Sequence, residues 1–245
     1  MIYGTRPVLE AIAAGKEIDR LFVQHGLRGS AFQELWAAIK EHNVPFKYVP
    51  IEKLNRFTRK NHQGIVAFLS QVEYQWIENV VPGIYEIGET PLIVVIDRVT
   101  DVRNAGAIAR SVECMGGHAL VMSEKNSAPM NGDAVKSSAG ALLRLPICRE
   151  KSLARSVQQL ANSGLQVVGI TEKASTLLSA IDFTVPTVLV MGSEEDGISS
   201  EVLRVCHHKA KIPMLGQVAS LNVSVACGMA LYEAIRQRTS TIPAD

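Results

Sequence analysis

Apolar residues recur in two different patterns along the chain, and the change between them divides it in two. In the first seventy residues, short segments with helical and strand periodicity alternate at close spacing. This pattern predicts a small α/β module with its own core, covering residues 1–72. Its expected helices are 6–14, 30–42 and 51–57, and its expected strands are 20–23, 46–49 and 65–69.

From residue 91 onward the apolar runs become nearly continuous, as in 93–96 and 188–191. Such runs are typical of strands covered on both faces in a parallel sheet, so we expect a larger α/β domain over 91–245. Its expected strands are 92–96, 119–122, 145–147, 166–170, 187–191 and 211–212. Its expected helices are 105–115, 133–139, 152–163, 199–205 and 223–238, with Gly116 and Gly164 as C-terminal caps. Between the domains, 73–90 is expected to be a linker with a short helix near Ile77, because Pro82, Gly83 and Gly88 interrupt the periodicity.

The last expected helix is unusual because residues 223–231 are apolar or small on every face. A helix of this kind is normally buried all round, in a core or against another subunit. Ser220 and Asn222 precede it, where free backbone N–H groups and the helix dipole favour anionic or carbonyl ligands. Either residue could equally be a simple N-cap.

Composition places the chain among ordinary well-packed proteins, with 47% apolar and 20% charged residues. No apolar run is long enough to cross a membrane, and the first residues lack the features of a signal peptide. The four cysteines have no metal-binding or disulfide spacing, so we expect buried thiols, no metal and a cytoplasmic location. The net charge of +1 hides an asymmetry, because residues 1–72 carry +4 and the rest −3. A basic front module suggests a polyanionic partner.

One segment of that module gathers side chains suited to RNA: Arg56, Arg59, Lys60, His62 and Gln63. Cations and amides in a loop can bind phosphates or bases. A solvated connecting loop is the alternative interpretation.

In the larger domain, polar loops follow three of the expected strands, at 97–106, 192–197 and 213–222. Ligands of parallel sheets bind outside the carboxyl ends of the strands. No dinucleotide-binding glycine motif, P-loop or zinc-protease motif is present. Arg110 lies one helical turn after Gly106, on a face expected to point toward the loops. It could also be a plain surface arginine, and Glu194 a capping carboxylate.

Taken together, the three loops resemble a known set of motifs. They read Asn104-x-Gly106-x-x-x-Arg110, then Leu189-Val-Met-Gly192-x-Glu194-x-x-Gly197, then Ile212-Pro-Met214 with Ser220-Leu-Asn222-Val-Ser-Val-Ala226. These are similar to the motifs of the SpoU/TrmH branch of the SPOUT RNA methyltransferases. Val102 departs from the family, which often has proline there. Tyr3-Gly4, Val8-Leu-Glu10 and His62-Gln-Gly-Ile65 resemble the substrate-binding domain of bacterial 23S rRNA guanosine 2′-O-methyltransferases.

The resemblance implies a C-terminal α/β trefoil-knot domain with a parallel sheet, working as a homodimer through that domain, and a small N-terminal RNA-binding α/β domain. It implies methyl transfer from S-adenosylmethionine to a ribose 2′-hydroxyl. The expected cofactor-binding residues are Thr171, Met191, Gly192, Ile212, Met214 and Leu221, and the expected catalytic residues are Asn104, Arg110, Glu194, Ser220 and Asn222. Because a guanidinium resists deprotonation, we expect Arg110 to stabilise charge on the target. A tRNA ribose methyltransferase and a non-catalytic RNA-binding assembly factor are the alternatives.

Overall fold

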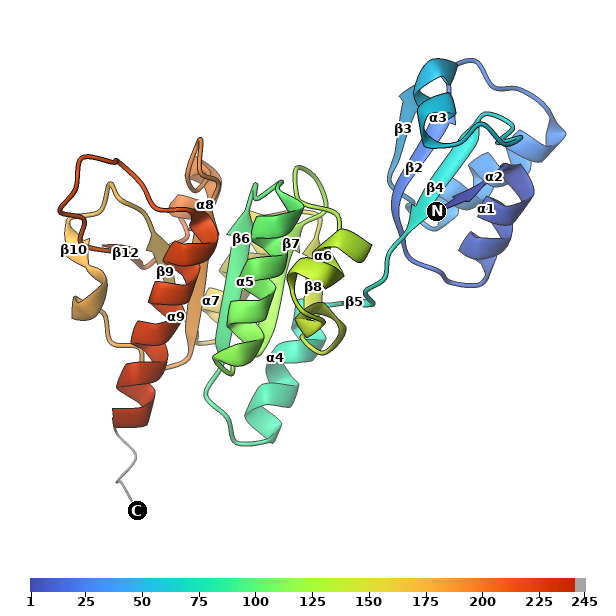
Figure 1. Cartoon of the computed structure of the whole chain (residues 1–245). Coiled ribbons are helices and arrows are strands. Elements are labelled where there is room, and N and C mark those ends of the chain that lie inside the picture. Colours follow the sequence, from blue (N-terminus) through green and yellow to red (C-terminus); the bar gives the residue numbers. More distant parts are fainter. Residues whose placement is uncertain (241–245) are drawn as a thin grey trace. The chain divides into compact units, whose positions relative to one another are not determined.

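The computed structural model describes residues 1–240, which form two compact units (Figure 1). The smaller unit comprises residues 1–73 together with 129–132, and the larger comprises 74–128 together with the chain from 133 onward. The α/β character expected for both parts of the sequence is confirmed.

The smaller unit is a four-stranded sheet with helices on both faces. Its strands, β1 (Ile2–Tyr3), β2 (Ile18–Gln24), β3 (Phe46–Val49) and β4 (Ile65–Leu69), lie in the order β1-β4-β2-β3. Only β2 and β3 pair in parallel. Alternate residues of β2 face opposite sides: Leu21 and Val23 pack with α1 (Thr5–Ala13) and α2 (Ser30–Glu41), whereas Phe22 packs with α3 (Ile51–Phe57). The unit therefore has two small cores, one on each face of the sheet.

The larger unit contains an eight-stranded sheet in which every neighbouring pair is parallel. The strand order is β10-β12-β9-β11-β6-β7-β8-β5. The strands are β5 (Tyr74–Gln75), β6 (Leu92–Asp97), β7 (Ala119–Ser123), β8 (Ile147–Glu150), β9 (Gln166–Ile170), β10 (Thr176–Leu177), β11 (Thr187–Gly192) and β12 (His208–Lys211). The predicted parallel sheet is confirmed. The strands expected at 145–147 and 211–212 are each displaced along the chain, because β8 and β12 carry charged residues that the apolar pattern does not register.

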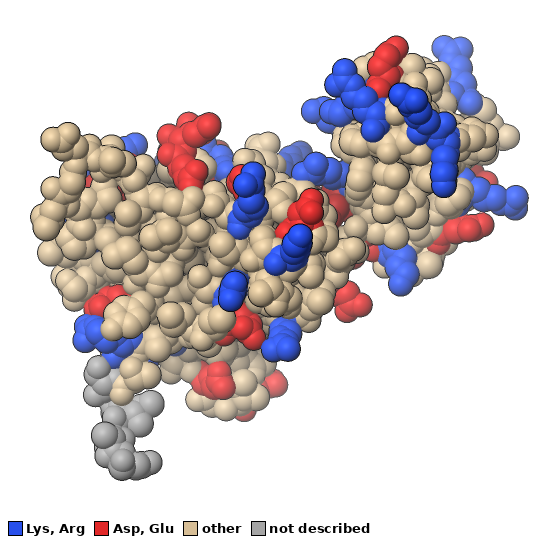
Figure 2. Space-filling model, in the orientation of Figure 1, with Lys and Arg blue, Asp and Glu red and all other residues tan. Residues whose placement is uncertain are grey.

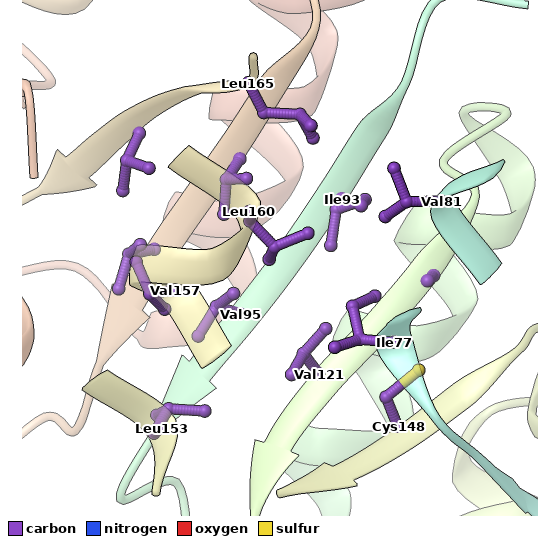
Figure 3. Packing of buried hydrophobic residues seen from close by; sticks show 14 of the residues in the cluster. Ile77, Val81, Ile93, Val95, Val121, Cys148, Leu153, Val157, Leu160 and Leu165 are labelled. Carbon is purple, nitrogen blue, oxygen red and sulfur yellow. The ribbon is translucent and has the colours of Figure 1, made fainter. Parts of the chain in front are cut away.

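Both faces of this sheet are covered by helices. On one face lie α4 (Ile77–Glu86), α7 (Leu153–Asn162) and α8 (Ser200–Leu203), whose apolar side chains pack on those of the sheet. Figure 3 shows Ile77 of α4 and Leu160 of α7 among sheet residues such as Ile93 and Val121. On the other face α5 (Val102–Cys114) and α9 (Val223–Ser240) lie side by side, and α6 (Gly132–Ser137) follows β7 (Figure 1). None of the helices within residues 1–240 is long and apolar enough to cross a membrane.

The segment expected to be a linker contributes to the larger unit. The helix predicted near Ile77 is present as α4, and it buries Ile77, Val80 and Ile84 in the core. Pro82 lies within α4 but on its exposed side. The helical spacing of the apolar residues therefore outweighs the helix-breaking residue. The preceding strand β5 pairs with β8 at the sheet edge.

Helix α9 is buried on one side only. Cys227, Leu231 and Ala234 are buried, whereas Val225, Met229 and Tyr232 are 51%, 44% and 60% exposed. The expectation of burial on every face is therefore wrong for the single chain, and burial against another subunit is the alternative that the sequence left open.

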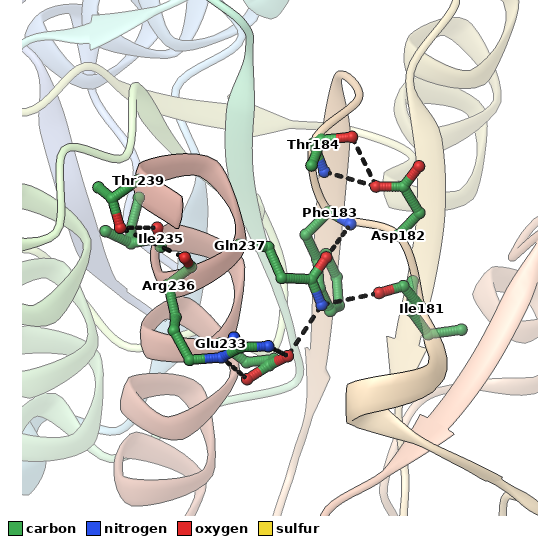
Figure 4. A network of polar contacts seen from close by, with 9 residues as sticks. All are labelled: Ile181, Asp182, Phe183, Thr184, Glu233, Ile235, Arg236, Gln237 and Thr239. Carbon is green, nitrogen blue, oxygen red and sulfur yellow. Dashed lines mark hydrogen bonds and ion pairs between the residues drawn. The ribbon is translucent and has the colours of Figure 1, made fainter. Parts of the chain in front are cut away.

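Polar contacts fasten the C-terminal half of α9 to the loop before β11 (Figure 4). Gln237 accepts a hydrogen bond from the Phe183 N–H at 2.8 Å and donates one to the Ile181 carbonyl at 3.0 Å. Arg238 donates to four backbone carbonyls in the segments that precede β6 and β11. Hydrogen bonds from Arg236 and Gln237 lower the pKa of Glu233 to about 2. These contacts fix the direction of α9, and hence the position of its N-terminus above the sheet.

The last strand, β12, lies between β9 and β10, although both precede it in the chain. The chain therefore returns to insert a strand between two earlier ones. The trefoil knot implied by the family resemblance stays a prediction, and this strand order is compatible with it.

Candidate functional site

A cavity of about 380 Å³ opens where the carboxyl ends of β9, β11 and β12 meet. This is the edge of a parallel sheet at which ligands bind. The structure brings together there all six residues expected to contact a cofactor: Thr171, Met191, Gly192, Ile212, Met214 and Leu221. Glu194 and Ser220, expected to be catalytic, also line the cavity.

The loop after β11 depends on two glycines. A Cβ atom on Gly192 would lie 2.1 Å from the carbonyl carbon of Gly197, so no other residue fits without moving the loop. Gly197 has a φ of +67°, in the left-handed region that glycine adopts most readily. Reciprocal backbone hydrogen bonds between Ser193 and Gly197, at 3.2 and 2.9 Å, close a tight turn. This turn projects Glu194 over the sheet edge.

Two charged residues at the end of β6 tie that turn to the neighbouring strand. The buried Asp97 accepts a hydrogen bond from the Ser199 N–H at 2.6 Å. Arg98, which has a φ of +60°, donates to the Gly197 carbonyl at 3.0 Å and pairs with Asp196 at 3.3 Å. Neither residue was predicted to have a role, although a charged pair directly after a continuous apolar strand was a visible signal.

A polar cluster joins the three loops. One oxygen of Glu194, Oε1, accepts hydrogen bonds from Asn104 Nδ2 at 3.3 Å, from the Val223 N–H at 3.3 Å and from Asn222 Nδ2. Asn222 Nδ2 also lies 3.0 Å from Asn104 Oδ1. Asn104 is held because Asp101 caps α5, accepting from the backbone N–H groups of Arg103 and Asn104. The Glu194 carboxylate therefore joins three expected catalytic residues, Asn104, Glu194 and Asn222, each from a different loop.

Asn222 both caps α9 and contributes to this cluster. Its side-chain oxygen accepts hydrogen bonds from Ser224 N at 3.0 Å and Ser224 Oγ at 2.6 Å, which is an N-cap arrangement. Its side-chain nitrogen donates to Glu194 and Asn104. Both interpretations of Asn222 left open by the sequence are thus compatible, since they use different atoms.

A second cavity, of about 600 Å³, lies beside the first and shares the segment 193–196 with it. Its lining includes Arg98, Asp101, Asn104 and Asn126. Because Glu194 lines both cavities, a molecule bound in either one would meet the polar cluster.

Arg110 stands apart from the cluster in the single chain. It is exposed on α5 and lines neither cavity, and its side chain makes no hydrogen bond or ion pair with the described residues 1–240. Gly106, on the same helix face, packs closely on α6: a Cβ there would lie 2.8 Å from the Ala134 carbonyl. The structure therefore does not bring Arg110 together with Asn104, Glu194 and Asn222 in one chain.

The loop expected to bind RNA divides into exposed and internal side chains. Arg56, Arg59 and Lys60 are exposed. His62 is only 7% exposed. Its Nδ1 accepts a hydrogen bond from the Gly64 N–H at 3.0 Å. The ring proton therefore lies on Nε2, which donates a hydrogen bond to Asn55 Oδ1 at 2.9 Å. Both ring nitrogens are occupied, so His62 shapes the loop and is not free for the direct RNA contact that we expected.

Gln63 also holds the loop, since its side-chain oxygen accepts a hydrogen bond from the Thr5 N–H at 3.1 Å. Its side chain is exposed, so the amide nitrogen can still reach solvent. Figure 2 shows Lys and Arg outnumbering Asp and Glu on the visible face of the smaller unit. The positive charge predicted from the sequence is thus displayed at the surface.

Two of the four cysteines, which were all expected to be buried, are not fully buried: Cys206 is partly buried, and Cys114 is exposed at the end of α5. Cys148 and Cys227 are buried, which raises the pKa of each thiol to about 12. All four are free thiols. Within residues 1–240, no three His, Cys, Asp or Glu side chains are arranged to hold a metal ion.

Relatives with this sequence pattern are RNA methyltransferases by name. The chain is 31% identical over 238 residues to YacO of Bacillus subtilis, named as a TrmH family tRNA/rRNA methyltransferase, covering 97% of this chain and 95% of that protein. It is 34% identical to an uncharacterized tRNA/rRNA methyltransferase of Mycobacterium ulcerans, covering 97% of this chain and 77% of the other.

Solved structures agree in fold. The SpoU methyltransferase AviRb from Streptomyces viridochromogenes, solved in complex with the cofactor AdoMet, has a TM-score of 0.63 and 26% identity over 98% of this chain and 90% of its own. The AdoMet-bound rRNA methyltransferase from Sinorhizobium meliloti has a TM-score of 0.61 and 25% identity over 96% of this chain and 86% of its own. The A. aeolicus TrmH/SpoU tRNA modifying enzyme has a TM-score of 0.57 and 34% identity, over 66% of this chain and 84% of its own.

Family models account for both units. The model for RNA 2′-O ribose methyltransferase substrate binding matches residues 1–75, and the SpoU rRNA Methylase family model matches residues 91–232, more than half of the chain. The chain therefore belongs to the SpoU rRNA methylase family.

Proposed function

We propose that the chain transfers a methyl group from S-adenosylmethionine to a ribose 2′-hydroxyl in RNA, and that its target is a guanosine of 23S rRNA. The observation that carries this proposal is the meeting of Asn104, Glu194 and Asn222 beside a cavity lined by the six expected cofactor residues. Family membership supports RNA methylation, and the relatives are named as both tRNA and rRNA enzymes.

The first cavity suits the cofactor in size and in the chemistry of its lining. A volume of about 380 Å³ falls in the range of small-molecule sites. Backbone groups at Gly192, Ile212 and Leu221 can bind the adenosine part, while Lys173 offers a cation to the carboxylate. Bound there, S-adenosylmethionine supplies an electrophilic methyl group on its sulfonium.

The polar cluster is suited to orienting the ribose. Methyl transfer requires the 2′-oxygen to lie in line with the methyl group, and the hydroxyl proton must leave. Glu194 presents a second carboxylate oxygen next to the one that holds the two asparagines. Asn104 also lines the second cavity, which gives the nucleoside room beside the cofactor. Ser220, at the rim of the first cavity, can orient the cofactor or the ribose.

Arg110 has the role of stabilising charge on the target. Its guanidinium stays protonated, so it can hold an adjacent phosphate and stabilise the developing alkoxide but not act as a base. Because Arg110 is exposed and lines neither cavity of its own chain, it must reach the target from outside the cluster.

A homodimer through the larger unit accounts for the exposed side of α9. Val225, Met229 and Tyr232 recur at intervals of four and three residues and so form one apolar stripe. Such a stripe is typical of a surface covered by another subunit. A second copy of the chain is the partner that the family resemblance implies, and the protein would act in the cytoplasm, where RNA substrates are found.

Ribosomal RNA is favoured over tRNA by the presence of the smaller unit. The solved rRNA methyltransferase from Sinorhizobium meliloti matches 96% of this chain, whereas the tRNA modifying enzyme from A. aeolicus matches 66%. A tRNA ribose methyltransferase is the second candidate, because the relatives' names include tRNA.

The test is methyl transfer from radiolabelled S-adenosylmethionine to purified rRNA and tRNA. We expect label in 23S rRNA with the wild-type protein, and a loss of at least about 100-fold with Arg110→Ala, while cofactor affinity measured by calorimetry is unchanged. Arg144→Ala, another exposed arginine of the larger unit, is the control. Near-normal turnover by Arg110→Ala would contradict the role of Arg110. No transfer by the wild-type protein to either RNA would favour the non-catalytic assembly factor.

A further inference from the structure

A group of partly exposed aromatic rings, separate in sequence from the RNA-binding loop predicted above, lies at the open edge of the smaller sheet. We call Trp36, Phe46, Tyr48 and His25 the aromatic platform. The Trp36 and Phe46 ring centroids are 4.9 Å apart, those of Phe46 and Tyr48 are 5.4 Å apart, and His25 stacks on Tyr48 at 5.5 Å. Phe46 and Tyr48 are 39% and 40% exposed.

Sheet register explains why these rings gather and why they stay exposed. Phe46 and Tyr48 are two apart on β3, so they share one face of the sheet. They pair with Leu21 and Val23, whose side chains lie in the core beneath α1 and α2. Because β3 is the edge strand, the helices cover Leu21 and Val23 but leave the rings of β3 partly open.

Positive charge lies on the platform and at the end of the sheet where His25 lies. The Lys40 ammonium lies over the Trp36 ring, 5.4 Å from its centroid. The basic loop 56–63 ends at the same end of the sheet as His25, because the Gly64 carbonyl accepts from the Gln24 N–H and β4 runs antiparallel to β2. The aromatic platform and the basic loop therefore both reach the same end of the smaller sheet.

We infer that the aromatic platform binds unpaired bases of single-stranded RNA, while Arg59 and Lys60 of the neighbouring loop bind the phosphates. Aromatic faces beside cations are the usual means of binding single-stranded nucleic acid, since every base has a face that can stack. The inference rests on RNA being the substrate, and it adds that the substrate presents an unpaired stretch in addition to the ribose that is methylated.

Charge favours RNA over a protein partner at this edge. A protein strand pairing with β3 would use its free backbone groups and would gain nothing from Lys40, Arg59 and Lys60. A polyanion uses all three, and the module of residues 1–72 carries a net charge of +4.

The experiment uses the intrinsic fluorescence of Trp36. The chain has two tryptophans, and Trp76→Phe, at an exposed position outside the smaller unit, leaves Trp36 as the single reporter. The probe is a mixed-sequence RNA of about 12 nucleotides, single-stranded or annealed to its complement. We expect the single strand to quench Trp36 and to bind more tightly than the duplex.

Substitution by leucine separates base stacking from packing. Phe46→Leu with Tyr48→Leu keeps apolar side chains at the sheet edge but removes the ring faces. Each lost stacking contact should weaken single-strand binding about 5- to 150-fold. Tyr85→Leu, an equally exposed tyrosine of the larger unit, should leave binding unchanged. Circular dichroism verifies that each variant is folded.

The outcomes distinguish this inference from the proposed function. Wild-type affinity in the leucine variant, or no response of Trp36 to RNA, overturns the aromatic platform even if methylation proceeds, and would fit a protein partner at β3. Weakened binding with methyl transfer restored at saturating RNA supports it. Failure of the wild-type protein to bind or methylate any RNA would instead refute the proposed function on which the inference rests.

Discussion

Substitution of Glu194 should affect methyl transfer much more than stability, because this residue holds the polar cluster together yet is itself exposed. Its Oε1 accepts three N–H groups, two of them from side chains expected to be catalytic. In Glu194→Ala, water can replace these hydrogen bonds at the surface, so the free energy of unfolding should fall by less than about 1 kcal/mol. Asn104 and Asn222 would lose their common acceptor, and misplacement of such groups by about 1 Å costs roughly 100-fold in turnover.

Glutamine at the same position refines the test. Glu194→Gln keeps an oxygen that can accept hydrogen bonds, but loses the charge that strengthens them about twofold. We therefore expect an intermediate loss of methyl transfer, on the order of 10-fold, which corresponds to about 1.4 kcal/mol. Single-turnover transfer from radiolabelled S-adenosylmethionine measures the chemical step, and urea unfolding measures stability.

Glu195 provides the matched control. It is the next residue, is exposed and lines both cavities, but it makes none of the three contacts to Oε1. Glu195→Gln should leave turnover within about threefold of wild type if loss of one surface charge is all that matters there. The reasoning is refuted if Glu194→Ala retains near-normal turnover, or if the two glutamine variants lose activity equally.

Three further predictions concern the dimer, the loop after β11 and a buried thiol. We expect the wild type to sediment as a dimer in analytical ultracentrifugation, and Met229→Asp, which places a charge in the exposed stripe of α9, to sediment as a monomer; unchanged dimers would exclude this face. Gly192→Ala should abolish cofactor binding in calorimetry and lower the free energy of unfolding by at least about 1–3 kcal/mol, because the new Cβ atom would clash with the backbone of Gly197. Gly216→Ala is the control: a Cβ atom there meets open space, so neither cofactor binding nor stability should change. Burial raises the pKa of Cys227 to about 12 from a usual 9, so its contribution to stability is complete below pH 9 and is lost as pH rises toward 12. Between pH 9 and 10 it should lose about 1 kcal/mol in urea unfolding, and Cys227→Ala should flatten that decline; an identical slope in both proteins would show that the thiol does not titrate as expected.

The apolar pattern predicted the fold best where strands are buried on both faces. The continuous apolar run 93–96 predicted an interior parallel strand, and it forms β6 in the middle of the sheet. The two-residue strands β1, β5 and β10 could not be predicted, because pairing partners define them and local propensity does not. Helix α4 is longer than the short helix predicted near Ile77, because Pro82 was taken to interrupt the helical spacing of Ile77, Val80 and Ile84.

The candidate site was predictable wherever its residues occupy recognisable motifs. Asn104, Glu194 and Asn222 come from three loops, and the sheet order brings those loops together. Arg98 was missed because its contacts depend on a left-handed backbone conformation, which the charged pair after the apolar strand does not specify by itself. His62 was misjudged for a related reason, since its burial depends on the fold of the loop around it.

The aromatic platform illustrates a limit of the same kind. Trp36 and Tyr48 are separated by twelve residues and belong to different elements, so only the packing of α2 beside β3 brings their rings together. The sequence placed Trp36 in the expected helix 30–42 and Phe46 and Tyr48 in the expected strand 46–49, with nothing to join them.

Mapping ribose 2′-O-methylation in total RNA from cells that have or lack this protein tests most directly whether the chain methylates 23S rRNA. We predict that its absence removes the 2′-O-methyl group from a guanosine of 23S rRNA, and that the wild-type chain restores it whereas Arg110→Ala does not. An unchanged 23S rRNA map, or a methyl group lost from tRNA instead, would contradict the account.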